Sequence, residues 1–174
     1  PSPPKHIGVI TSSSTAAFQD ILSTIQRRAP SAQISISPAM VQGDTAANTI
    51  INALNRILKF NDNNKDNSID LVILARGGGS IEDLWCFNNE SLAREISSFP
   101  IPTISGVGHE IDFTICDFVS DMRAPTPTAS AEIATEFHFK AIDKINDLYG
   151  DLRRTIINSL KNKIQNIDHV KSKI

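Results

Sequence analysis

The chain has 174 residues, of which 40% are apolar and 21% are charged, close to the averages for a soluble globular domain. These values exclude a disordered or collagen-like chain, and no apolar run approaches the ~20 residues that span a bilayer. The two cysteines, Cys86 and Cys116, are too few for a disulfide framework or a zinc site, so we expect reduced thiols in a cytosolic protein. The sequence begins at Pro1, without an initiator methionine, and we expect it to be part of something longer.

The net charge of −2 is unevenly distributed along the chain. Residues 1–137 hold 9 Lys/Arg and 15 Asp/Glu, a balance of −6, whereas residues 138–174 hold 8 and 4, a balance of +4. The first part is therefore not a generic basic nucleic-acid binder. Any polyanion must be held by local features, or by parts of the protein outside this sequence.

Apolar patterns predict strands that alternate with helices. A β-branched run at 5–11 predicts the first strand, and apolar residues at helical spacing then predict a helix that ends before Pro30. Residues 33–41 alternate like a second strand, and a turn at 42–44 precedes a second amphipathic helix. A polar surface loop follows that helix at 61–67.

The second half of the pattern contains a strand that is apolar on both faces, at residues 70–75, as expected in the middle of a parallel sheet. A broken helical stretch at 81–99 and a fourth strand at 101–105 follow. The alternation predicts a three-layer, Rossmann-like α/β domain over residues 1–127, with a parallel sheet in the order 2-1-3-4.

Residues 128–174 are expected to form one long helix that begins a coiled-coil assembly region. At ~1.5 Å per residue this helix would be about 70 Å long, too long to bury its apolar stripe against the preceding domain. We therefore expect its distal half to pair with another chain as a coiled coil. The alternative is a helix that folds back.

The loops after strands 1, 3 and 4 should meet at one edge of the sheet, because parallel strands end on the same edge. In the loop after strand 3, Arg76 precedes Gly77, Gly78, Gly79 and Ser80. Backbone N–H groups of residues 77–80 could turn towards a phosphate, and Arg76 would add a fixed positive fork. The alternative is a tight strand-to-helix turn. The absence of GxGxxG and of a P-loop argues against a dinucleotide cofactor or an NTPase.

A loop rich in hydroxyl groups follows strand 1 and is a second candidate phosphate cradle, formed by Thr11, Ser12, Ser13 and Ser14. Its alternative role is to cap the first helix. Asp20 lies further along that helix, where an acidic side chain is most simply a solvated surface residue.

His109 and Asp112 are three residues apart, so one helical turn would bring them to one face. A carboxylate beside an imidazole orients the ring and favours its protonated form, which suits acid–base chemistry. The alternative is a structural histidine beside an acid. Gly106 and Gly108 favour function, because they let a substrate approach the backbone.

Other side chains give weaker signals. Trp85 and Phe87 could stack on bases, but we expect them in the core. Five carboxylates could supply oxygen ligands for Mg²⁺ but lack a recognisable two-metal spacing, so we assign no metal site and leave a Mg²⁺ requirement open. These five are Glu82, Asp83, Glu110, Asp112 and Asp117.

Three segments resemble the exodeoxyribonuclease VII large-subunit family: RGGGSIEDLW at 76–85, GHEIDFT at 108–114 and RAPTPTASAE at 123–132. Residues 9–12 and 41–43 also fit, and the match runs from about Pro4 to Glu136. The resemblance implies a bacterial cytoplasmic exonuclease, active in DNA degradation and repair, that cleaves single-stranded DNA from either end into 5′-phosphorylated oligonucleotides. It also implies that an OB-fold and a longer helical region, which binds several copies of a small subunit, lie outside this sequence.

The resemblance places the family's essential residues at Asp20, Arg76, His109 and Asp112. Arg76 and the following amides would stabilise charge on phosphorus, and His109, oriented by Asp112, would act as general acid–base or as a nucleophile. Asp20 would position water or a metal. Departures from the family pattern, at Ile111, Cys116 and 61–67, remove none of these groups. The alternative functions are an enzyme acting on a small nucleotide-like substrate, and an assembly module.

Overall fold

A computed structural model of the chain describes residues 3–13, 15–77, 81–108 and 111–171. The chain separates into two compact units, residues 1–136 and residues 137–174. The first unit is a parallel α/β sheet in the order β2-β1-β3-β4-β5, which confirms the predicted class and order. Its strands are β1 (His6–Thr11), β2 (Gln33–Pro38), β3 (Leu71–Ala75), β4 (Thr103–Gly106) and β5 (Met122–Arg123).

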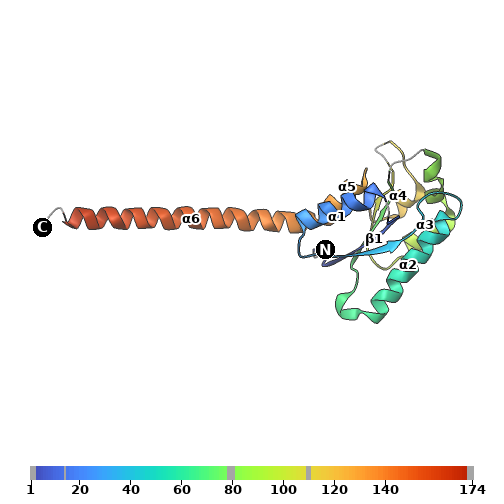
Figure 1. Cartoon of the computed structure of the whole chain (residues 1–174), viewed down its shortest axis with the longest axis horizontal. Helices are drawn as coiled ribbons and strands as arrows, with labels where there is room; N and C mark the ends of the chain where they lie inside the picture. Colours follow the sequence, from blue (N-terminus) through green and yellow to red (C-terminus); the bar gives the residue numbers. More distant parts are fainter. Residues whose placement is uncertain (1–2, 14, 78–80, 109–110, 172–174) are drawn as a thin grey trace. The chain divides into compact units, whose positions relative to one another are not determined.

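Helices cover both faces of this sheet (Figure 1). They are α1 (Ala16–Arg28), α2 (Ala46–Asn63), α3 (Glu90–Ser97), α4 (Ile115–Val119) and α5 (Pro127–Ala134), with 3-10 turns η1 (Lys65–Asn67) and η2 (Ile81–Asn88). One core cluster contains Val9 and Ile73 of the sheet and lies under α1 and α5. The other contains Ile10 and Leu74, the next residues along the same strands, and lies under α2 and α3. This alternation produces the expected three layers, because successive strand side chains point to opposite faces.

The fifth strand, β5, was not predicted. It has two residues and pairs in parallel with β4, Ile104 lying opposite Met122. The Asp121 carboxylate fixes its start by accepting hydrogen bonds from the backbone N–H of Thr103 at 2.7 Å and from its hydroxyl at 3.1 Å. A strand this short leaves no periodic signal in a sequence.

The helix expected from residue 128 onwards is two helices. α5 ends before Thr135, and α6 runs over Glu136–Lys171. The Thr135 hydroxyl donates to the carbonyl of Ala131 at 2.7 Å and accepts from Nε of Arg28 on α1 at 3.0 Å. α5 therefore packs in the first unit, against α1.

The second unit consists of α6, apart from its first residue. The helix has 36 residues, about 54 Å of helix at ~1.5 Å per residue. Apolar side chains recur along it and are between 50% and 64% exposed at Ile145, Leu148, Leu152, Ile156, Leu160 and Ile164. In the described part of the chain, no helix combines the length and hydropathy that a bilayer crossing requires.

Candidate functional site

The carboxyl ends of the central strands bring the predicted loops together at one edge of the sheet. β1 ends at Thr11, β3 at Ala75 and β4 at Gly106, and all three are parallel. The backbone N–H of Arg76 donates to the carbonyl of Gly106 at 3.5 Å, so the loops after β3 and β4 start in contact. This edge is where open parallel sheets place their ligands.

Arg76 is the most deeply buried charged side chain of this edge, with 3% of its surface exposed. A guanidinium keeps its charge at all relevant pH values, and a buried charge is stable only among compensating polar or anionic groups. Because Arg76 is buried, solvent screens its charge weakly. Such a group attracts a phosphate more strongly than a mobile surface arginine does.

The loop after β3 lies on the first turn of α1. A Cβ at Gly77 would be 3.6 Å from Cβ of Ala17 and 3.8 Å from Cβ of Thr15. Asp20 is exposed on α1, three residues after Ala17, and so lies one turn along the face that meets Gly77. The structure thus places the carboxylate of Asp20 on the helix that adjoins the Arg76–Gly77 segment.

The side chains of the hydroxyl-rich loop after β1 differ in their burial and in their hydrogen bonds. The Thr11 side chain is completely buried, and its Oγ1 has no hydrogen-bond partner among the described residues. Ser12 is half-buried and Ser13 exposed. Thr15 is the N-cap residue of α1, but its hydroxyl donates to the carbonyl of Ser12 at 2.8 Å and makes no capping bond to α1. The bond from Thr15 to Ser12 therefore closes the loop on itself.

Asp112 lies in the loop before α4, because that helix begins at Ile115. The Asp112 carbonyl is so close to Gly108 that a Cβ at Gly108 would be 2.1 Å from it. Only glycine permits this approach. The Asp112 side chain is half-buried, and it forms no hydrogen bond with another described residue.

A buried carboxylate, Asp117, holds this loop in place. Its Oδ1 accepts from the hydroxyl of Ser105 on β4 at 2.5 Å, and its Oδ2 accepts from the backbone N–H of Thr114 at 2.8 Å and its hydroxyl at 2.9 Å. These bonds and the capping box of α4 tie the segment after Asp112 to the sheet. Asp117, one of the five carboxylates that could supply a ligand for Mg²⁺, thus has a structural role in this loop.

Several predicted site residues lie outside the described residues, so their placement stays a prediction. They are Ser14, Gly78, Gly79, Ser80 and His109. Among the metal candidates, Glu110 and the side chains of Glu82 and Asp83 also lie outside the described part of the chain. Within that part, no three His, Cys, Asp or Glu side chains gather closely enough to hold a metal ion.

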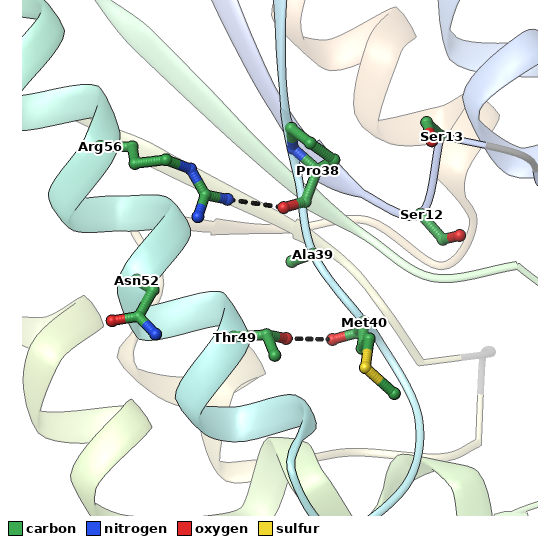
Figure 2. A pocket seen from close by; sticks show the side chains of 8 residues that line it. All are labelled: Ser12, Ser13, Pro38, Ala39, Met40, Thr49, Asn52 and Arg56. Carbon is green, nitrogen blue, oxygen red and sulfur yellow. Dashed lines mark hydrogen bonds between the residues drawn. The ribbon is translucent and has the colours of Figure 1, made fainter.

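A pocket of about 350 Å³ opens beside Ser12 and Ser13 of the loop after β1 (Figure 2). Between β2 and α2, Arg56 donates to the carbonyl of Pro38 at 2.6 Å and Thr49 donates to that of Met40 at 2.9 Å. Asn52 lies between these two side chains on the same face of α2. The sequence does not reveal this pocket, because Thr49, Asn52 and Arg56 occupy ordinary surface positions of a helix.

The aromatic and thiol side chains divide between core and surface. Phe87 is completely buried, as expected, but Trp85 is 75% exposed, so the core role predicted for it is wrong. Burial, together with the nearby Asp117 carboxylate and Cys86 thiol, raises the pKa of Cys116 from 9.0 to about 12. Cys116 is therefore an unreactive core thiol, and Cys86 is half-buried.

Comparison with known proteins identifies the chain's relatives. The family model described as "Exonuclease VII, large subunit" matches residues 1–174. An exodeoxyribonuclease 7 large subunit of Clostridioides difficile is 49% identical over 165 residues, which cover 95% of this chain and 39% of that protein. That of Vibrio parahaemolyticus is 54% identical over 135 residues, covering 78% of this chain and 29% of the relative. The chain thus spans well under half of these relatives, but the family match extends over its whole length, and the chain belongs to the exonuclease VII large-subunit family.

Proposed function

We propose that this chain is the catalytic part of an enzyme that hydrolyses phosphodiester bonds of single-stranded DNA from either end and releases 5′-phosphorylated oligonucleotides. The observation that carries the proposal is Arg76, a cation 3% exposed at the carboxyl end of the central strand. It precedes a glycine run suited to phosphate. The names of the relatives support a deoxyribonuclease, and direction and products come from the resemblance.

In this proposal Arg76 and the amides of residues 77–80 stabilise the charge that develops on the phosphoryl oxygens, which is a large part of the rate enhancement in such reactions. His109 is the general acid–base and Asp112 orients it. Asp20 positions the attacking water. If Mg²⁺ took part in the reaction, the carboxylates of Asp20 and Asp112 would be its oxygen ligands.

The proposal includes a partner. α6 has apolar side chains half or more exposed along its length, and a helix of this kind is stabilised by a second helix packed on the same stripe. We assign that stripe to copies of the small subunit, with a second large subunit as a further occupant. The setting is the bacterial cytoplasm.

The test uses the complete enzyme with its small subunit. Oligonucleotides labelled at the 5′ or the 3′ end are digested as single strands and as duplexes, with and without a chelator. We expect short 5′-phosphorylated products from both labels on the single strand, slow attack on the duplex, and loss of cleavage in His109→Ala. Cleavage by His109→Ala at the wild-type rate, or cleavage of free nucleotides only, would contradict the proposal.

A further inference from the structure

A short segment around Asp112 carries most of the large apolar side chains that are exposed in the described part of the first unit. These side chains are Ile111, Phe113, Ile115 and Phe118. Soluble proteins seldom concentrate exposed apolar surface in one place unless that surface binds something. The segment therefore needs an occupant.

Two of these side chains form an ordered aromatic pair. The rings of Phe113 and Phe118 stack with their centroids 5.7 Å apart and their planes 24° from parallel. The guanidinium carbon of Arg123 lies 3.9 Å from the centroid of the Phe113 ring. Phe118 is 75% exposed and Phe113 53%, so the Phe118 ring is open to solvent and is backed by a second ring and a cation.

This pair lies beside the candidate site. Phe113 directly follows Asp112, and Arg123 ends β5 at the same edge of the sheet at which Arg76 follows β3. The bonds that Asp117 makes to Thr114 and Ser105 fix the start of α4, which carries Phe118. A ligand on the Phe118 ring would therefore be held close to Asp112 on a rigid support.

We propose that Phe118, backed by Phe113 and Arg123, is a stacking platform for an unpaired base of the DNA strand, close to the bond that is cleaved. The inference rests on the proposed function and names the part of the substrate that this surface contacts. A flat aromatic face accepts any base, and the adjacent guanidinium attracts the backbone phosphate. An aliphatic protein surface would gain nothing from that charge, so the combination favours a nucleotide.

The experiment measures DNA binding separately from cleavage. It uses the complete enzyme carrying Asp112→Asn, and each further change is added to this parent. Fluorescently labelled oligo(dT) is compared with an oligonucleotide of the same length that carries abasic residues. Phe118→Leu should weaken oligo(dT) binding about 5- to 150-fold, the range expected for one stacked base. It should leave binding of the abasic strand unchanged, and Phe118→Trp should restore oligo(dT) binding.

Met122→Ala is the matched control. Met122 is also exposed and apolar, but neighbouring strand residues point to opposite faces, so it lies away from Arg123 and the Phe113 ring. Met122→Ala should bind both oligonucleotides like the parent. Equal losses on both strands in Phe118→Leu, or no loss on either, would overturn the platform. If the enzyme cleaves normally, either binding result leaves the proposed function intact. If binding depends on the bases but the otherwise wild-type enzyme does not cleave, the platform is supported and the proposed function is refuted.

Discussion

Asp117 and Cys116 are neighbouring buried residues with ionisable side chains. They determine the stability of the loop between β4 and α4 that contains Asp112, called here the Asp112 loop. Asp117 accepts three hydrogen bonds inside the protein, and Cys116 lies in the core beside it. Breaking a buried charged network leaves donors without acceptors, which costs more than the loss of an exposed bond. The stability of this loop can therefore be measured residue by residue.

Asp117→Ala should lower the free energy of unfolding by about 2–4 kcal/mol, because Ser105 and Thr114 lose their buried acceptor. Asp121→Ala is the matched control, since Asp121 also accepts from a backbone N–H and a threonine hydroxyl but is exposed, and about 1 kcal/mol is expected. Denaturant unfolding of both variants measures the difference. Equal losses of unfolding free energy in the two variants would show that the burial of Asp117 adds nothing to its contribution to stability.

The raised pKa of Cys116 predicts a loss of stability at alkaline pH. In the unfolded chain the thiol ionises near pH 9, whereas in the folded protein its pKa is about 12. The protonated thiol thus favours folding below pH 9, and that contribution falls by up to ~1.4 kcal/mol per pH unit between 9 and 12. The unfolding free energy of Cys116→Ala should fall less steeply than that of the wild type above pH 9. Parallel slopes would contradict this account.

At the scale of elements, the contact between Gly108 and the Asp112 carbonyl determines the shape of the loop after β4. Gly108→Ala would force these backbones apart, because a Cβ would lie 2.1 Å from the carbonyl oxygen. Small displacements of a catalytic group can cost about 100-fold in rate. We expect a fall in kcat of that order on single-stranded DNA.

Gly150→Ala is the control for this prediction, because a Cβ at Gly150 meets no atom within 4 Å and lies in a helix. That change should raise helix stability by up to ~1 kcal/mol and leave kcat unchanged. Thermal unfolding and steady-state cleavage are measured for both variants. Full activity in Gly108→Ala would show that the Asp112 loop is free to move.

The sequence predicted those elements whose signals are periodic. The parallel strands, their order, and the turn at Gly43, where φ is +86°, follow from apolar runs and turn residues. The start of α4 at Ile115, which the Thr114–Asp117 capping box fixes, was not predicted, and the exposure of Trp85 depends on tertiary packing. The break at Thr135 was missed since its bond to Arg28 joins residues 107 apart in sequence.

At the scale of the whole molecule, α6 is expected to connect the catalytic part to its partners. Between Ile145 and Ile167 the apolar stripe makes six steps in 22 residues, about 3.67 residues per turn, which requires little supercoiling.

Changing both Leu152 and Ile156 to Asp should abolish assembly with the small subunit, because each buried Ile or Leu contributes roughly 1.5–3 kcal/mol. Co-purification measures assembly, and circular dichroism should show a folded α/β unit. Normal subunit ratios would contradict the prediction.

Arg76 is the group proposed to hold the reacting phosphate. The most direct measurement is single-turnover cleavage of single-stranded DNA by the complete enzyme with Arg76→Lys, which keeps the charge but loses the two-pronged hydrogen bonding of the guanidinium. The rate should fall by about 100-fold or more, corresponding to ~3 kcal/mol of transition-state stabilisation, while the thermal unfolding midpoint and small-subunit binding stay near wild type. A cleavage rate within a few-fold of wild type would contradict the assignment of the active site to this edge of the sheet.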